Sequence, residues 1–440
     1  MFQHRRIARA AIVMAAFATI AGSSSAFAAE GAGAGSSLSL SNEIAPHYLD
    51  ENSPGVAPGA PVAAAPSLNA QRTPLMGLLE QAGVGRTLDD LRLNIYGHIE
   101  GSYTYNTDNP AEHLNLGRVF DINDLRGEMN QLDLNLERIA DPHQFDLGGR
   151  LELLYGADAR FIHGSDFIDY DNKNVANSTR LYNGPEYQFD IPQLYLDLTL
   201  PIGEGIRIRA GKFLFFKQID PNASVFYSHS FTFGGALPFT LTGITAYYAF
   251  NDNISVEGGI SRGWGQTFTD NNGAIDGLGR VNWKINSQSK FTLAFICGPE
   301  LNDDNSHYRT AVDATFTYTL NPQTTLLFDG VYGYQAQPSG TTTDEWYGIS
   351  GYVVYKLSSY TNINFRGEFY RDEGGLTTGL SQSLFEGTLG LTVTPFPDNA
   401  VGQNLKIRPE VRYDYSNVGY FNGLTEHSQW TLAVDAFFDF

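Results

Sequence analysis

Sixteen segments of this chain alternate apolar and polar residues one by one. In the first segment, residues 91–105, Leu93 and Ile95 share one face while His98 and Glu100 share the other. Strand side chains alternate with period two, so this pattern predicts a β-strand with its charges on a single face. The other fifteen segments are residues 129–139, 144–155, 189–200, 205–212, 240–250, 253–262, 280–286, 290–297, 309–320, 323–335, 345–357, 361–371, 384–395, 404–415 and 429–440.

The connections between these segments alternate in length. The short ones lie at residues 141–143, 201–205, 251–253, 287–289, 321–322, 358–359 and 396–403. The long ones lie at residues 106–128, 156–188, 213–239, 263–279, 298–308, 336–344, 372–383 and 416–428. This alternation places every short turn at one end of the sheet and every long loop at the other, as in outer-membrane barrels. We therefore predict an all-β fold, a closed antiparallel transmembrane β-barrel of about 16 strands, in preference to a soluble sandwich or propeller.

The N-terminus has the pattern of a secretory signal peptide. Arg5, Arg6 and Arg9 precede an apolar run over residues 10–21, and Ala26-Phe-Ala28 follows as a cleavage site. The run is shorter than the roughly 20 residues that span a bilayer. We predict a signal peptide over residues 1–28 and export toward the bacterial outer membrane.

Two further segments precede the predicted barrel. Residues 29–73 are rich in Ala, Gly, Ser and Pro, which predicts a flexible linker. Residues 74–83 begin with Pro and end with Gly, which is typical of a short helix. The predicted organisation is a signal peptide (1–28), a linker (29–73), a short periplasmic helix or lead-in (74–90) and a transmembrane barrel (91–440).

Charge narrows the classes of partner. The chain has 48 acidic and 28 basic residues, a net charge of −20, and removal of the signal peptide takes away three more arginines. Nucleic-acid binding is therefore disfavoured. The single cysteine, Cys297, alternates in phase with apolar neighbours, which favours a lipid-facing position over a reactive thiol or metal ligand.

The last eleven residues, 430–440, form an alternating strand that ends on Phe440. This ending resembles the terminal strand of bacterial outer-membrane barrels. The resemblance implies that Phe440 belongs to the signal read by the barrel assembly machinery, and that the last strand pairs with the first.

Several short motifs resemble those of the OmpL-like β-barrel porins, over roughly residues 74–440. They are residues 95–104, 192–196, 209–213, 226–230 and 242–243. The resemblance implies an outer-membrane pore in contact with outer-membrane lipids. We expect passive diffusion of small hydrophilic solutes, with a homotrimer left open. The alternatives are a channel selective for sugars or other nutrients, and a plugged structural or adhesive surface barrel.

Alternation places charged residues of three segments inside the barrel, because a lipid-facing Arg or Lys at mid-depth costs about 2–4 kcal/mol. These candidate pore-lining residues are Arg207, Arg209, Arg366, Glu368, Lys406, Arg408, Glu410, Arg412 and Asp414. They can brace the wall as an ion-pair network, set selectivity, or do both. Inward acids on the other segments outnumber these bases, so we expect a segregated lumen and a weak preference for cations.

The loop over residues 213–239 is too rich in Phe and Tyr to remain in water. It follows the fifth segment, and general porins fold the loop at this position into the lumen. This similarity predicts a constriction loop, with packing over the rim or into a neighbouring subunit as the alternative. Its candidate residues are Lys217, Asp220, Phe226, Tyr227 and His229.

We expect no enzymatic activity, no cofactor and no metal site. Acidic and amide clusters at residues 166–172, 269–273 and 302–305 lack the spacing of an EF-hand and are interpreted as solvated loops. An outer-membrane phospholipase would need a paired Ser and His. Ser228 and His229 are adjacent, which would place them on opposite sides of a strand.

Overall fold

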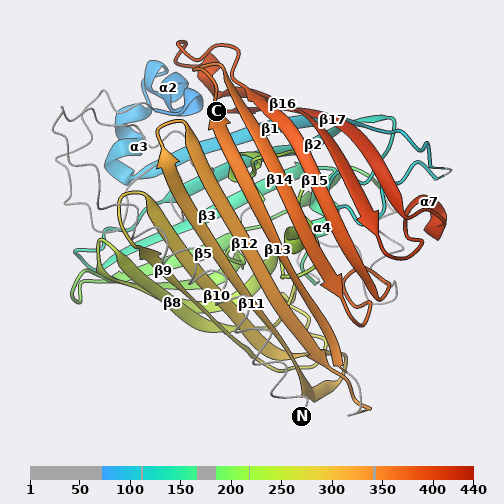
Figure 1. Cartoon of the computed structure of the whole chain (residues 1–440). Coiled ribbons are helices and arrows are strands. Elements are labelled where there is room, and N and C mark those ends of the chain that lie inside the picture. Colours follow the sequence, from blue (N-terminus) through green and yellow to red (C-terminus); the bar gives the residue numbers. More distant parts are fainter. Residues whose placement is uncertain (1–71, 111, 166–184, 218, 340–342) are drawn as a thin grey trace, which may run out of the picture.

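A closed β-barrel dominates the computed structural model, which describes residues 72–110, 112–165, 185–217, 219–339 and 343–440 (Figure 1). The predicted signal peptide and all but the last two residues of the predicted linker lie outside these ranges. No helix among the described residues is long and apolar enough to cross a membrane.

The strands follow the predicted order closely. They are β1 (Leu93–Asn106), β2 (Arg126–Arg138), β3 (Asp146–Gly156), β4 (Gln188–Asp190), β5 (Leu194–Leu200), β6 (Ile206–Leu214), β7 (Thr240–Asn251), β8 (Ile254–Ser261), β9 (Asp276–Lys284), β10 (Ser289–Leu301), β11 (Asp304–Asn321), β12 (Thr324–Ala336), β13 (Thr343–Lys356), β14 (Thr361–Asp372), β15 (Gln382–Val393), β16 (Leu405–Ser416) and β17 (Ser428–Asp439). Every pairing is antiparallel, and apart from β4 and β5 each strand pairs with its neighbours along the chain.

β4 and β5 together form one position in the wall, because both pair with β3. Pro192 lies in the interruption between them and has no backbone N–H for the ladder. The barrel therefore has 16 strands, as predicted from the sequence.

β1 and β17 close the barrel. Their register pairs His98 with Asp439 and runs to Asn106 and Thr431. Just beyond the last strand, the backbone N–H of Phe440 donates to the Gly97 carbonyl at 2.8 Å, and the Gly97 N–H donates back to Phe440 at 3.0 Å. Closure leaves no unpaired sheet edge, which is the condition for a β-structure in lipid.

One predicted loop is wrong. Residues 298–308 were expected to form a long connection, but β10 extends to Leu301 and β11 begins at Asp304. The turn between them is Asn302-Asp303, with Asp303 at a φ of 56°. Asp tolerates this left-handed conformation better than most residues, so a tight hairpin forms where the polar composition suggested a loop.

The two faces of the wall differ as the alternation predicts. Outward side chains such as Leu134, Phe365 and Leu432 are exposed and apolar, while inward Glu100 and Asp133 are buried acids. The outward face suits lipid, and the inward charges need partners inside the barrel.

Short helices accompany the strands. They are α2 (Pro74–Gln81), α3 (Gly85–Leu91), α4 (Ala159–Ile162), α6 (Phe231–Gly234) and α7 (Phe421–Leu424), with 3-10 turns η1 (Pro221–Ala223) and η2 (Gly402–Asn404). The Thr73 side chain caps α2 by accepting from the Met76 N–H. α2 and α3 lie at the same end of the barrel as the C-terminus (Figure 1).

Candidate pore constriction

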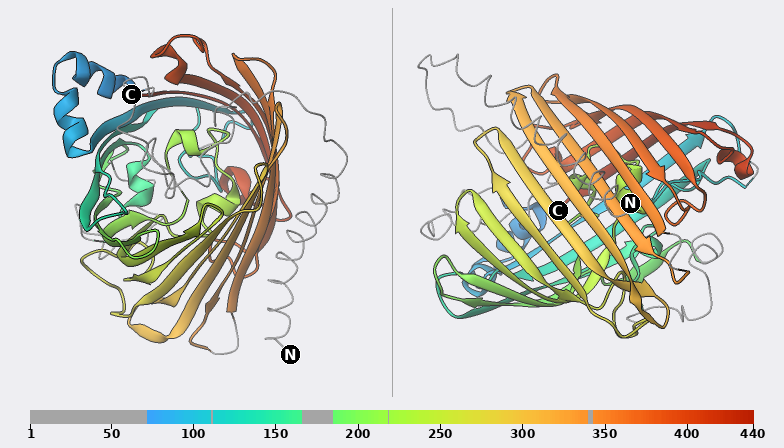
Figure 2. Two further views of the ribbon diagram at one scale, coloured as in Figure 1. Left: turned by 90° about the vertical axis from the view of Figure 1, so that its left-hand side faces the viewer. Right: turned by 60° about the horizontal axis from the view of Figure 1, so that its bottom comes forward.

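The connection between β6 and β7, residues 215–239, is here named the constriction segment, and all of it except residue 218 is described. It lies inside the ring of strands, as the view along the barrel in Figure 2 shows. Hydrogen bonds to inward side chains hold it against the wall.

Two wall carboxylates bind backbone amides of the segment in the same way. Glu410 of β16 accepts from the N–H groups of Tyr227 at 3.0 Å and Ser228 at 3.2 Å. Glu368 of β14 accepts from Phe231 and Thr232, both at 2.7 Å. Each carboxylate therefore satisfies two consecutive donors with charge-assisted hydrogen bonds.

Three wall arginines bind backbone carbonyls of the segment. Arg366 donates to Ser228 at 2.7 Å, and Arg412 donates to His229 at 2.6 Å. Arg408 donates to Pro221 at 2.8 Å and Ser224 at 2.7 Å. The predicted lining residues of β14 and β16 thus lie on the lumen side of the wall, beneath the segment.

The same arginines are neutralised by acids on a neighbouring strand or, for Arg412, on the same strand. Arg366 pairs with Glu386 at 3.0 Å, Arg408 with Asp435, and Arg412 with Asp414 at 2.8 Å. The side chain of Arg412 is 0% exposed. Buried charges are tolerated when they are paired and hydrogen-bonded, and each of these arginines has an acid partner and donates to the segment.

Lys217 attaches the first part of the segment to another side of the barrel. Its Nζ lies 2.9 Å from Asp313 of β11 and 2.8 Å from Asp329 of β12. Burial disfavours its charge, but these two carboxylates raise the pKa of Lys217 above its usual value. Lys217 therefore remains an ammonium ion.

Tyr227 and His229 lie at the centre of the seated segment. The Tyr227 hydroxyl accepts from Ser102 of β1 at 2.8 Å and from Asn130 of β2 at 3.1 Å. Burial, together with the Arg408 and Arg366 charges, lowers the pKa of His229 to about 3. His229 is therefore neutral at pH 7.

The aromatic side chains of the segment are buried by packing. Phe226 and Tyr227 are 1% and 2% exposed. His229 lies 4.2 Å from Phe233 and 5.0 Å from Phe120, measured between ring centroids. The segment thus contributes to an apolar core inside the barrel, which explains how so many aromatic residues occur in one connection.

The remaining predicted residues lie elsewhere in the lumen. Arg209 of β6 forms a two-point contact with Asp197 of β5 at 2.9 and 3.0 Å, and its side chain is 15% exposed. Arg207 lies over the Tyr247 ring at 4.8 Å. Lys406 of β16 donates to Asn222 at 2.8 Å, and the Asp220 side chain is 45% exposed.

Sequence reasoning did not predict that the first long connection, residues 106–128, contacts the constriction segment and the wall. Arg118 pairs with Asp121 and with Asp414 of β16, and Phe120 packs against the constriction segment. The available signal was one Arg among several apolar residues, Leu116, Val119, Phe120 and Ile122, in a connection expected to lie in water. Asn130 and Gln131, inward on β2, were also missed because neutral amides carry no charge pattern.

Ser228 and His229 do not form a catalytic pair. Ser228 Oγ accepts from Arg366 at 3.3 Å, and His229 Nδ1 lies 3.1 Å from the Tyr227 carbonyl. No hydrogen bond joins Ser228 to His229 within the described part of the chain. Both residues instead help to hold the loop against the barrel wall.

Comparisons with known proteins agree with this architecture. The anion-selective porin of Comamonas acidovorans is 11% identical, with 79% of this chain and 99% of that chain covered and a TM-score of 0.55. OprB of Pseudomonas putida at high pH is 12% identical, covering 82% and 97%, with a TM-score of 0.54. In-vitro folded OmpT of Vibrio cholerae in its trimer form is 11% identical, covering 79% and 99%, with a TM-score of 0.51.

At these identities the solved structures establish a shared fold. A search of curated protein sequences found no match. The sequence profile of the family described as "Putative beta-barrel porin-2, OmpL-like" matches residues 92–440, which is most of the chain. The chain therefore belongs to the OmpL-like β-barrel porin family and is a channel of the bacterial outer membrane.

Proposed function

We propose that this porin admits small hydrophilic solutes by passive diffusion, through a lumen narrowed by the constriction segment. The observation that supports this proposal is that Glu368 and Glu410 of the wall accept hydrogen bonds from the backbone of the segment. A loop held at several points by hydrogen bonds to buried side chains of the wall is pre-organised, so its position defines a fixed limit on solute size.

A sugar-selective channel is less well supported. Such a site would present aromatic faces to the solute, but Phe226, Tyr227 and Phe231 are each 5% exposed or less. Their faces are occupied by packing against the barrel interior. Size and charge, rather than aromatic stacking, should therefore govern passage.

The charges available to solutes lie where the wall retains some exposure. Arg209 and Asp197 keep side-chain exposures of 15% and 12%, and Asp220 keeps 45%, whereas Arg366 and Arg412 keep 1% and 0%. Acids predominate in the chain as a whole, and we propose a weak preference for cations, reduced locally by Arg207 and Arg209.

Three further assignments complete the proposal. OmpT of Vibrio cholerae has a trimer form, and we propose a homotrimer here. Residues 1–28 direct export, residues 29–73 form a linker, and residues 74–90 lie on the periplasmic side. The channel performs no catalysis, and Phe440 serves recognition by the barrel assembly machinery.

Single-channel recording in planar bilayers tests the pore, and swelling of liposomes in neutral sugars of increasing size tests the size limit. We expect a graded cut-off without preference among isomers. Replacing Arg207 and Arg209 with Gln should raise the cation-to-anion permeability ratio while leaving the size limit unchanged. A barrel that is folded but gives no conductance would show a plugged structural protein, and a swelling rate that depends on sugar identity would support the selective channel.

A further inference from the structure

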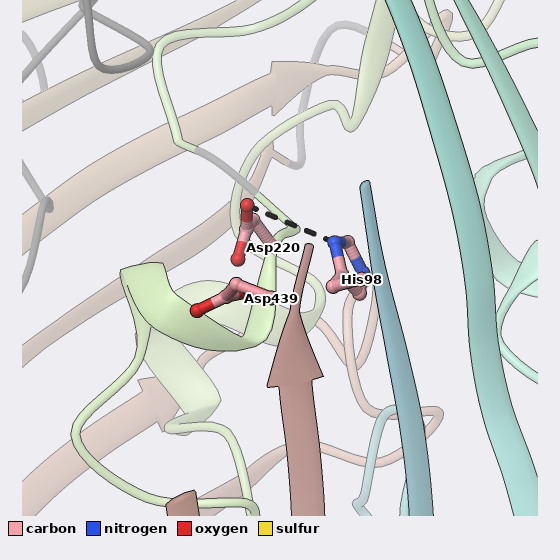
Figure 3. A group of neighbouring side chains, drawn as sticks. All are labelled: His98, Asp220 and Asp439. Carbon is pink, nitrogen blue, oxygen red and sulfur yellow. Dashed lines mark ion pairs between the residues drawn. The ribbon is translucent and has the colours of Figure 1, made fainter. Parts of the chain in front are cut away.

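One histidine lies where β1 pairs with β17 to close the barrel, a position here named the seam. It is surrounded by carboxylates from three different elements. His98 of β1 is 4% exposed, and its Nδ1 lies 3.9 Å from Asp220 of the constriction segment and 3.8 Å from Asp133 of β2. Asp439 of β17 faces His98 directly across the closing pair of strands. Figure 3 shows the three side chains close to one another, with the contact between His98 and Asp220 dashed.

Hydrogen bonds fix the orientation of the His98 ring. The Gln131 side-chain amide donates to Asp158 at 2.9 Å and to the Ile219 carbonyl at 3.0 Å, so its Oε1 must be the acceptor on the other side. That oxygen lies 2.9 Å from His98 Nε2, which therefore carries a proton and donates. His98 Nδ1 is then the ring nitrogen that faces the carboxylates. Metal-binding histidines are commonly held in this way, with the second ring nitrogen donating to an oxygen.

The two aspartates are also oriented from behind. Asn222 donates its backbone N–H to Asp220 Oδ1 at 2.7 Å, and its side-chain amide to Asp439 Oδ2. One oxygen of each carboxylate is thereby occupied, and the second oxygen of Asp220 lies 3.9 Å from His98 Nδ1. One residue of the segment thus aligns both acids.

Carboxyl groups from three different elements gather around His98. Three carboxylates, those of Asp133, Asp220 and Asp439, surround one imidazole, and Lys406 reaches the cluster through Asn222. Asp133 is 1% exposed, and its Oδ2 has no hydrogen-bond partner among the described residues. A buried carboxylate oxygen without a donor needs an explanation, and an ion bound nearby is one that fits an acidic cluster.

We propose that His98, Asp220 and Asp439 bind one divalent transition-metal ion, with Asp133 as a neighbouring charge. Their ligand atoms lie within 4.8 Å of one another. Around tetrahedral Zn²⁺, ligand atoms about 2.0–2.2 Å from the metal lie about 3.3–3.6 Å apart, so binding would draw this set together. Asp220 can supply that movement because it lies on the segment and is 45% exposed.

The donor set selects among cations. Ca²⁺ and Mg²⁺ prefer oxygen ligands alone, whereas an imidazole nitrogen beside carboxylates suits Zn²⁺ and related ions. The sequence predicted no metal site, because His98 and Asp439 are far apart along the chain and meet only when the barrel closes. A bound ion would join β1, β17 and the constriction segment, and so fasten the segment at the seam.

Titration calorimetry on the folded full-length barrel without a histidine tag tests the proposal, after chelator treatment and desalting. We expect one Zn²⁺ per chain, with no comparable heat from Ca²⁺ or Mg²⁺. His98→Gln and Asp220→Asn should each weaken binding by about tenfold or more. His143→Gln, in the exposed turn after β2, is the matched control and should bind as the unaltered protein does.

Co²⁺ provides a second measurement, because ligation by His98 should give a visible absorption band that His98→Gln abolishes. Heat-modifiable gel mobility identifies folded variants. Asp220→Asn changes no strand residue, so it keeps the test valid if His98→Gln fails to fold. Absence of Zn²⁺ binding, or equal binding by the folded variants, would overturn the proposal and leave His98 as a protonated partner of the acids.

Discussion

Glu368 and Glu410 should be the main attachment of the constriction segment, and replacing both with Gln tests this directly. Each carboxylate accepts from two consecutive N–H groups at 2.7–3.2 Å. A Gln of the same shape retains one accepting oxygen, but its other terminal atom is an NH₂ group that faces a donor. Each substitution therefore removes one hydrogen bond and the charge that strengthened both.

A hydrogen bond to a charged group contributes about 1.5–3 kcal/mol. Loss of two such bonds, one at each carboxylate, should weaken seating by about 3–6 kcal/mol. Each 1.4 kcal/mol changes an equilibrium about tenfold, so the unseated population should rise by at least about a hundredfold. The arginine contacts to the Pro221, Ser224 and His229 carbonyls remain, so the segment should open transiently rather than leave the lumen.

Hydrogen exchange measured by mass spectrometry on peptides covering residues 227–232 should show faster exchange in the double variant. Single-channel recordings should show larger and noisier conductance. Asp197→Asn is the matched control, because it removes an inward carboxylate that bonds Arg209 and makes no hydrogen bond to the segment. Unchanged exchange in a correctly folded double variant would refute the argument that these carboxylates hold the segment.

Three other outcomes follow from the structure. Phe440→Ser should lower the outer-membrane level in cells but permit refolding in detergent, because the Phe440 closure to Gly97 uses backbone atoms; equal surface levels would contradict an assembly role. His229 has a pKa of about 3 in the folded protein, below its usual 6.5, so binding of the constriction segment to the wall is fully stable above pH 6.5. As pH falls toward 3, the free energy of this binding should weaken by up to about 1.4 kcal/mol per pH unit. Hydrogen exchange of the segment at pH 5 and pH 7 measures this, and His229→Gln should remove the part of the difference that His229 causes. Arg408→Ala with Arg412→Ala leaves their partner acids uncompensated and should strengthen cation preference in reversal-potential measurements; an unmoved reversal potential would show that β16 does not influence the conducting path.

The wall of the barrel could be predicted from the sequence because its determinants are local. Alternation with period two needs only neighbouring residues, and it located 16 strands to within a few residues at most ends. It failed at residues 298–308, where long strands continue as a hairpin through a polar stretch. Polar composition indicates exposure to water. Strands that extend beyond the lipid are exposed to water as loops are, so composition alone does not separate the two.

The interior of the barrel could be predicted only in outline. Aromatic content showed that residues 213–239 must be buried, but the partners of this segment are wall residues more than a hundred positions away, such as Arg366 and Glu410. Their contacts exist only after the strands have closed. For the same reason, the meeting of His98 with Asp439 has no signature in either local sequence.

Inward placement of a charge therefore does not determine whether a permeating ion meets it. Arg412 and Arg209 both face the lumen, but Arg412 is covered by the constriction segment and paired with Asp414, whereas Arg209 retains exposure. A charge that is buried and paired acts mainly through the structure that it holds, since its field is largely cancelled by its partner. In this porin the arginines of β14 and β16 should thus set the width of the path, and the less covered charges of β5 and β6 should set its preference for ions.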